Sequence, residues 1–274
     1  MTEIQIVILS IFKEIKKLCD MHGIPYYAIG GTCIGAVRHK GFIPWDDDLD
    51  IAIPIDHFDR FTDIAKKELP EHLYVYSSED IRHYHYIWLK ICDKRTTFIE
   101  ESEKGYSDAY KGVFVDVMPL SGVPCCSKNE FIHFLKKIKR YQILNDLTRF
   151  PVKVNSFKDL IKAILSRTLT FFLPFNFFSK KYLRFLKRFP LESSLKTGYV
   201  WDNWNDIPSL IFSSCWFGDG VELDFEDTHI RCPKDFDRYL KAQFGEYMVL
   251  PPVEQRQIHN GFVDINKSYI KYRF

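Results

Sequence analysis

Apolar residues near the N-terminus recur at helical spacing. Residues three or four positions apart share one face of a helix, and the set here is Ile4, Val7, Ile8, Ile11, Phe12, Ile15 and Leu18. Thr2 and Gln5 have the spacing of a capping box, in which each side chain binds the backbone N–H of the other residue. The pattern therefore predicts an amphipathic helix that ends near His22-Gly23.

The following segment mixes short strands with helices. Strands are predicted at 26–29, 49–53, 74–76, 86–91 and 113–117, and helices at 32–37 and 57–68. The first strand runs directly into Gly30-Gly31, and Pro54 stops the second.

Helical spacing returns in the middle of the chain, where prolines separate three segments. The predicted helices there are 129–147, 157–173 and 180–189, and a further helix at 235–245 follows irregular strands and loops at 200–233. Mixed helices and strands predict an α/β or α+β core with a helical insertion. We assign the core to 1–127, the insertion to 128–198 and the segment that completes the core to 199–274.

The charge of the chain is unevenly distributed. Its 274 residues are 46% hydrophobic and carry a formal net charge of +2. Residues 128–190 contain 15 lysines and arginines against three acidic residues, a net charge of +12. An acidic body therefore carries a basic insertion, which favours an anionic partner.

Two features of the sequence bear on its compartment. No run of about 18 uncharged apolar residues is present, and the N-terminus lacks the basic start of a signal peptide. The seven cysteines show no Cys-x-x-Cys spacing, so neither a zinc site nor a disulfide framework is predicted. We expect a cytoplasmic protein with reduced thiols.

Acidic residues cluster around the second predicted strand, at Asp46, Asp47, Asp48 and Asp50. Alternate residues of a strand share a face, so Asp48 and Asp50 would point the same way, joined by Asp46 if the strand extended that far. Two carboxylates on one face suit Mg²⁺. A solvated acidic turn is the alternative.

A calcium loop of the EF-hand type is not predicted for this cluster. Ile51 stands where such a loop requires glycine, and His57 stands where it requires glutamate.

Two further features favour a site that handles phosphate. Gly30-Gly31 would let the backbone approach a phosphate closely, although a tight turn is the alternative. Asp116 lies inside an apolar strand, where a carboxylate is costly unless it is paired or bound to metal. Together with Asp48 and Asp50, these residues predict a two-metal site for in-line phosphoryl transfer.

At these residues the chain resembles the nucleotidyltransferase superfamily and, more closely, the LicD family of phosphorylcholine transferases, to which the fukutin-related proteins are related. The segments that carry the resemblance are 30–50, 89–91 with 94–96, 114–120, 244–248 and 250–252. The resemblance implies an α+β fold with a nucleotidyltransferase-like mixed sheet flanked by helices.

The same resemblance implies an activity. It is the metal-dependent transfer of phosphocholine from CDP-choline to a hydroxyl of a cell-surface glycan or lipid-linked glycan precursor (lipopolysaccharide, teichoic acid or capsule), with release of CMP. Transfer of another alcohol phosphate, such as ribitol phosphate from CDP-ribitol, and nucleotide transfer from an NTP are the alternatives.

Roles for individual residues follow from the resemblance. Asp48, Asp50 and Asp116 would bind the metal ions, two Mg²⁺ with Mn²⁺ as a substitute, and Asp46 would serve as an outer ligand or as the base for the acceptor hydroxyl. Gly30, Gly31 and Thr32 would hold the phosphates. The residues that would balance charge or line the site are Arg38, His39, Lys40, Lys90, Arg95 and His259. A solvated Lys90 and a merely structural His259 are the alternatives.

The basic insertion has a second distinctive feature. Phenylalanines crowd residues 169–178 beside lysines, which suits peripheral contact with the anionic inner face of the cytoplasmic membrane. A helical subdomain with its aromatic residues packed inward is the alternative. No base-reading motif is present, so nucleic acid is not expected as a partner.

Tryptophans offer a way to recognise choline. Trp201, Trp204 and Trp216 could cage a quaternary ammonium by cation–π contact, with burial in the core as the alternative.

Overall fold

A computed structural model describes residues 1–84, 86–124, 127–150, 154–199, 210–256 and 261–272. Its helices are α1 (Glu3–His22), α2 (Gly30–Ile34), α3 (Ile55–Glu68), α4 (Lys128–Arg149), α5 (Phe157–Phe172), α6 (Phe177–Leu186) and α7 (Phe236–Phe244). Its strands are β1 (Tyr27–Ala28), β2 (Asp50–Pro54), β3 (Leu73–Tyr76), β4 (Leu89–Asp93), β5 (Thr97–Glu100), β6 (Phe114–Val123), β7 (Lys196–Gly198), β8 (Ile211–Ser213), β9 (Val221–Phe225), β10 (Thr228–Cys232) and β11 (Gly261–Asp264). The fold is α+β, as predicted.

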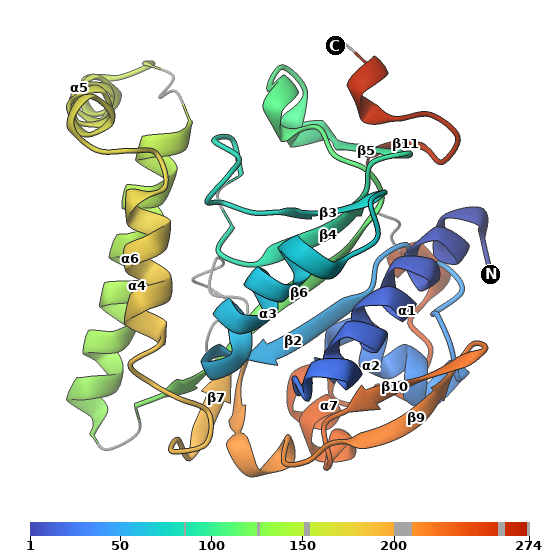
Figure 1. The fold of residues 1–274 in the computed structure, drawn as a ribbon. Coiled ribbons are helices and arrows are strands. Elements are labelled where there is room, and N and C mark those ends of the chain that lie inside the picture. The colour runs from blue at the N-terminus through green and yellow to red at the C-terminus, as the bar shows by residue number, and fades with distance from the viewer. Residues whose placement is uncertain (85, 125–126, 151–153, 200–209, 257–260, 273–274) are drawn as a thin grey trace.

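A mixed sheet forms the centre of the molecule (Figure 1). Its main strand order is β1-β2-β6-β4-β3, and β7 extends it by pairing with the far end of β6 and with β8. β2 and β6 run parallel, and the other neighbours in this sheet run antiparallel. Separate ribbons are formed by β9 with β10 and by β5 with β11.

The longest strand, β6, accommodates a proline within the sheet. The N–H of Asp116 donates to Leu49 on the β2 side, so the backbone nitrogen of Pro119, three residues later, faces the opposite side. On that side β4 pairs as far as Val117 and β7 starts at Ser121. Pro119 therefore falls between the two pairings, where no N–H is needed.

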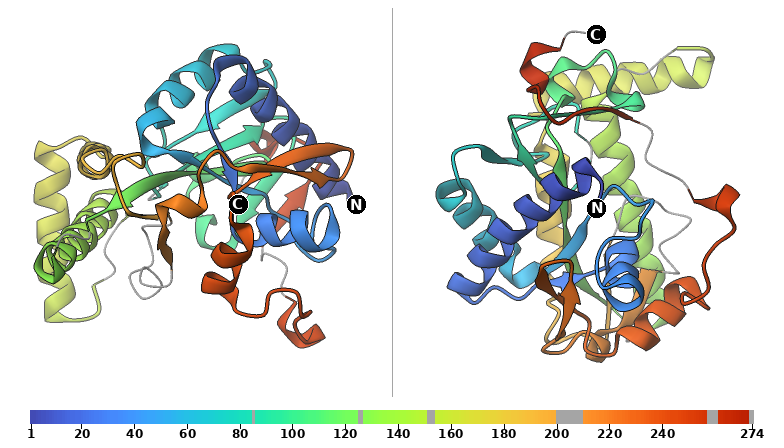
Figure 2. Two further views of the ribbon diagram at one scale, coloured as in Figure 1. Left: turned by 90° about the horizontal axis from the view of Figure 1, so that it is seen from below. Right: turned by 90° about the vertical axis from the view of Figure 1, so that its right-hand side faces the viewer.

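Helices cover both faces of the sheet. In the left view of Figure 2, α1 and α3 lie on one side of the sheet and α2 and α7 lie on the other. The capping box predicted for α1 is present, because Gln5 N donates to Thr2 Oγ1 and Thr2 N donates to Gln5 Oε1. Gly23, with a φ of 60°, ends the helix as predicted.

The basic segment forms the three predicted helices, which lie beside the sheet (Figure 1). α6 begins and ends three residues earlier than predicted, at Phe177 and Leu186. Strand β7, within the 128–198 segment, belongs to the main sheet. None of the helices in the described ranges is long and apolar enough to cross a membrane.

One buried arginine ties this insertion to the core. Arg149, at the end of α4, donates to the backbone carbonyls of Ser78, Ile81 and Arg82 at 2.6–3.0 Å. It also donates to Ser179 Oγ on α6 at 2.9 Å. These acceptors compensate for the burial of the guanidinium, which is 1% exposed.

Candidate active site

Three charged side chains occupy one rung of the sheet. Asp50 on β2 is in register with Asp116 on β6, which is in register with Lys90 on β4. Registered residues on neighbouring strands project from the same face. This face is the one that α2 covers, since a Cβ added at Gly30 would lie 3.8 Å from Asp50 Oδ2. We call these three residues the acidic rung.

Asp116 is held by two donors. Lys90 Nζ lies 2.9 Å from Asp116 Oδ1 and 3.0 Å from Oδ2, and the indole N–H of Trp88 donates to Oδ1 at 2.9 Å. Burial favours the neutral amine of Lys90, but the charge of Asp116, its hydrogen bond and the charge of Glu100 together outweigh burial and raise the pKa of Lys90. Lys90 and Asp116 therefore form a buried ion pair. This pairing offsets the free-energy cost that is expected for a carboxylate inside an apolar strand.

Negative charge exceeds the local positive charge at the rung. Loss of solvent raises the pKa of Asp50 well above its ordinary value, and the neighbouring charges of Asp48 and Asp116 raise it further. Burial likewise raises the pKa of Asp116, which Lys90 opposes only in part. These carboxyl groups therefore favour any ligand that brings positive charge.

The acidic loop approaches the rung without being part of the strand. β2 begins at Asp50, one residue later than predicted, and it does not extend to Asp46, so residues 46–49 form an acidic loop before the strand. Instead, Gln5 on α1 holds the loop by donating to the backbone carbonyls of Ile43 at 3.2 Å and Asp46 at 2.7 Å. The capping residue of the first helix thus also positions the acidic loop.

The Gly30-Gly31-Thr32 segment packs against these acids. A Cβ added at Gly31 would lie 2.8 Å from Asp46 Oδ2, so only glycine leaves room for that carboxylate. Thr32 Oγ1 accepts a hydrogen bond of 2.8 Å from the N–H of Asp50. The N–H of Gly30 donates to the hydroxyl of Tyr239 on α7 at 2.8 Å. A phosphate reaching this amide would therefore compete with Tyr239.

Two of the predicted cationic residues, Arg38 and Lys40, are directed toward other parts of the chain. Arg38 Nη1 donates to the backbone carbonyl of Tyr247 and, at 3.4 Å, to that of Val249, so it binds the loop after α7. Lys40 extends toward Asp224 on β9 at 4.0 Å, with a side chain that is 76% exposed.

The remaining predicted cations are dispersed. Arg95 forms an ion pair of 2.6 Å with Asp93. Asp93 is the last residue of β4, at the opposite end of that strand from Lys90. His39, at the end of the π-helical turn Gly35–His39, has its pKa lowered by burial and by the charge of Arg38. His259 lies outside the described residues.

The carboxylates of the acidic rung and the acidic loop suit a hard divalent cation in chemistry and charge. They do not form a complete set of metal ligands. Within the described ranges, no three histidine, cysteine, aspartate or glutamate side chains are placed to hold one metal ion together. Both oxygens of Asp116 already contact Lys90. Carboxylate oxygens are nevertheless the ligands Mg²⁺ prefers, and a bound cation would stabilise the ionised forms of Asp50 and Asp116, whose pKa values are raised by burial first and by neighbouring carboxylates second.

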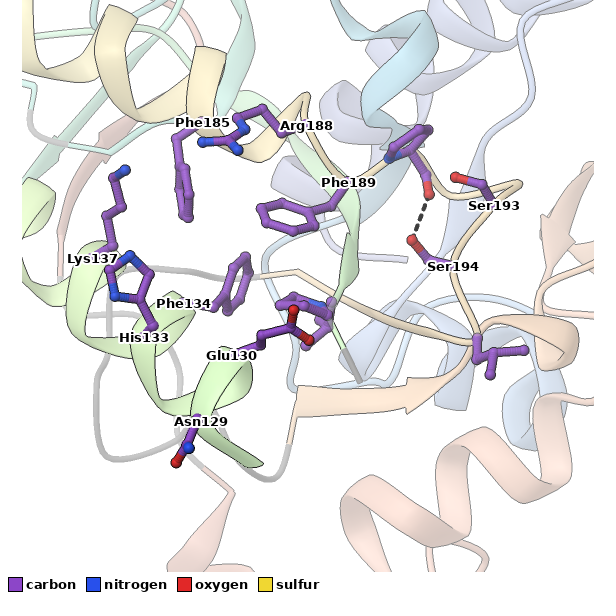
Figure 3. Close-up of a pocket in the computed structure, with 14 residues that line it drawn as sticks. Asn129, Glu130, His133, Phe134, Lys137, Phe185, Arg188, Phe189, Ser193 and Ser194 are labelled. Carbon is purple, nitrogen blue, oxygen red and sulfur yellow. Dashed lines mark hydrogen bonds between the residues drawn. The ribbon is translucent and has the colours of Figure 1, made fainter. Parts of the chain in front are cut away.

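The largest of the described cavities lies elsewhere. It has a volume of about 850 Å³ and lies between α4, α6 and the end of β6. Figure 3 shows the rings of Phe134, Phe185 and Phe189 gathered around it, with Lys137 and Arg188 nearby. None of the predicted site residues lines this cavity.

Three residues at the site were not predicted from the sequence. The sequence identified Gln5 only as a member of the capping box. It identified Tyr239 only as a residue of a predicted helix. Trp88 fell in a strand predicted from 86, but β4 begins at Leu89 because Tyr86 and Trp88 stack on each other at 4.0 Å. Of the three tryptophans considered for choline, Trp201 and Trp204 lie outside the described residues, and Trp216 packs against the core.

Comparison with known proteins defines the class. Residues 23–157 match the family model described as the nucleotidyltransferase domain of LicD, FKTN and FKRP. The lipopolysaccharide cholinephosphotransferase LicD of Haemophilus influenzae is 31% identical over 273 residues, covering 98% of this chain and 97% of the relative. Uncharacterized proteins of Rickettsia prowazekii and Rickettsia typhi are 48% identical over 44 residues, 16% of this chain. The matched domain contains the whole acidic rung, and the class is that of the phosphotransferases.

The chain belongs to the LicD family.

Proposed function

We propose that the protein transfers phosphocholine from CDP-choline to a hydroxyl of a cell-surface glycan precursor and releases CMP. The observation that carries this proposal is the similarity to the Haemophilus cholinephosphotransferase along nearly the whole of both chains. The relative acts on lipopolysaccharide, which supports lipopolysaccharide as the acceptor here, and a teichoic acid or capsule precursor offers the same kind of hydroxyl.

The arrangement of charged groups suits the proposed reaction. The acceptor oxygen attacks the phosphorus of phosphocholine, the bond from phosphorus to the CMP oxygen breaks, and CMP leaves with that electron pair. Asp46, held near Gly31, would accept the proton of the acceptor hydroxyl. Lys90 would keep Asp116 ionised through its ion pair.

A divalent metal ion is part of the proposal. Asp48, Asp50 and Asp116 would hold Mg²⁺, two ions in the full site with Mn²⁺ as a substitute, and the bound metal would neutralise charge on the transferred phosphoryl group. We expect chelation to abolish turnover and added Mg²⁺ or Mn²⁺ to restore it. Undiminished turnover after exhaustive chelation would remove the metal from the proposal.

The identity of the leaving group separates this function from its alternatives. Purified protein is incubated separately with CDP-choline, CDP-ribitol and NTPs, and the products are identified. Release of CMP mainly from CDP-choline is expected. CMP from CDP-ribitol alone would change the donor, and pyrophosphate from an NTP would change the reaction.

We further propose that helix α5 docks on an anionic membrane, where a lipid-linked acceptor would be presented. None of its residues is buried, although it carries seven large apolar side chains that are exposed: Phe157, Leu160, Ile161, Ile164, Leu165, Phe171 and Phe172. At 3.6 residues per turn these side chains fall within an arc of about 140°. Lys158, Lys162 and Arg167 flank this arc, which matches a helix lying in a membrane interface.

Vesicle flotation tests this contact. We expect the protein to float with phosphatidylglycerol vesicles and not with phosphatidylcholine vesicles, and the double variant Phe171→Ser/Phe172→Ser to lose binding. Ile6→Ser is the matched control, because Ile6 is an exposed apolar residue on α1. Equal flotation of the double variant and wild type, or binding only to nucleic acid, would contradict the membrane contact.

A further inference from the structure

A second cavity lies beside the acidic rung and has aromatic walls. Its volume is about 430 Å³, and the rings of Tyr84, Tyr86, Tyr106 and Phe150 line it together with the imidazole of His83. The Tyr84 and Tyr86 rings meet edge to face at 5.4 Å, as do those of Tyr106 and Phe150 at 5.7 Å. We call this space the aromatic cavity.

The aromatic cavity is acidic as well as aromatic. Glu100, Glu103 and Asp146 line it, and no lysine or arginine does. The cavity between α4 and α6, by contrast, has Lys137 and Arg188 in its walls. Lys111, which does not line the cavity, pairs with both Glu100 and Glu103, and the charge of Asp146 acts on the guanidinium of Arg149. The charged side chains that line the cavity are therefore acidic, with His83 as the one basic group beside them.

The aromatic cavity is connected to the acidic rung by direct contacts. Tyr86 stacks on Trp88 with ring centroids 4.0 Å apart and an interplanar angle of 22°. Trp88 in turn donates its indole N–H to Asp116. A substrate whose phosphate lies at the rung can therefore place an attached group along this aromatic wall.

We propose that the aromatic cavity binds the quaternary ammonium group of the donor. A quaternary ammonium has no N–H to donate, so aromatic ring faces and nearby carboxylates provide its main attraction. A neutral polyol such as ribitol lacks the positive charge that these ring faces attract. The identity of the donor rests on the function proposed above, whereas the affinity for a quaternary ammonium rests on the cavity alone.

Binding measurements with three probes test this inference: tetramethylammonium, CDP-choline and CMP. Tyr106→Leu removes a ring, and we expect it to weaken binding of tetramethylammonium and CDP-choline roughly 2- to 30-fold and to leave CMP binding unchanged. Tyr106→Phe keeps the ring and should bind like wild type. Asp146→Asn should weaken binding of tetramethylammonium and CDP-choline up to about fivefold. Phe244→Leu is the control, because this exposed ring on α7 does not line the cavity.

The outcomes separate this inference from the proposed function. Unchanged binding of tetramethylammonium and CDP-choline in Tyr106→Leu, or equal weakening of CMP binding, would overturn the assignment of the cavity even if CDP-choline is turned over. Conversely, Tyr106-dependent binding of tetramethylammonium by a protein that does not use CDP-choline would support the cavity and overturn the donor.

Discussion

The buried ion pair of the acidic rung makes a quantitative prediction for Lys90→Met. The side chain of Lys90 is 5% exposed and that of Asp116 is 11% exposed, so neither charge is well solvated. Removing one partner of a buried pair leaves the other charge uncompensated, at a cost of about 3–5 kcal/mol. Methionine can still pack on the Phe114 ring, whose centroid lies 3.5 Å from Lys90 Nζ, so lost packing adds little.

Thermal and urea denaturation would measure this loss. We expect the melting temperature of Lys90→Met to fall by roughly 6–15 °C. The double variant Lys90→Met/Asp116→Asn should recover most of the loss, because asparagine is uncharged and still accepts the hydrogen bond from Trp88.

The dependence on pH provides an independent check. Without Lys90, the pKa of Asp116 is higher in the folded protein than in the unfolded chain, so the folded state binds more protons between these two values. Stability therefore falls as pH rises through that window, and the deficit should be smaller near about pH 5 than near about pH 8. A loss below about 1 kcal/mol, or a double variant less stable than Lys90→Met, would refute the reasoning.

Three further predictions concern other parts of the molecule. Gly31→Ala should displace the Asp46 carboxylate, lowering turnover about tenfold or more with a stability change below about 1 kcal/mol; normal turnover would contradict the contact. Arg149→Met should lower the free energy of unfolding by about 3 kcal/mol in denaturation experiments, because it leaves buried backbone carbonyls without a donor. A loss below about 1 kcal/mol would be inconsistent with this role of Arg149. Burial raises the pKa of Cys92 to about 12, so less thiolate forms there than at the exposed Cys215. Mass spectrometry should therefore show that iodoacetamide labels Cys215 first, and faster labelling of Cys92 would contradict its burial.

Local patterns in the sequence predicted most of the helices, because each amphipathic face and capping residue is encoded within a few turns. The same holds for the strand that carries Asp116. Its full length could not be predicted, since β6 continues to Val123 only because β7, more than 70 residues later, pairs with its end. The start of β4 was predicted three residues too early for a different reason, because Tyr86 and Trp88 stack on each other instead of continuing the strand.

The candidate site shows the same division between local and long-range information. Asp50 and Asp116 were identified from their place on strands, but their alignment with Lys90 follows from strand order and register. Gln5 reaches the acidic loop across 41 residues of sequence, and Tyr239 reaches Gly30 across 209. No local pattern encodes such contacts, so sequence reasoning identified the charged groups and missed the residues that position them.

The most direct test of the proposed phosphocholine transfer is the rate of CMP release from CDP-choline in the presence of a glycan acceptor. Wild-type protein should release CMP as phosphocholine appears on the acceptor. Asp48→Asn and Asp50→Asn should abolish release while circular dichroism shows an intact fold. Asp116→Asn should abolish it too, with reduced stability because Lys90 loses its partner. No release of CMP by the wild type would contradict the function, and retained release by a variant would contradict the role of that carboxylate.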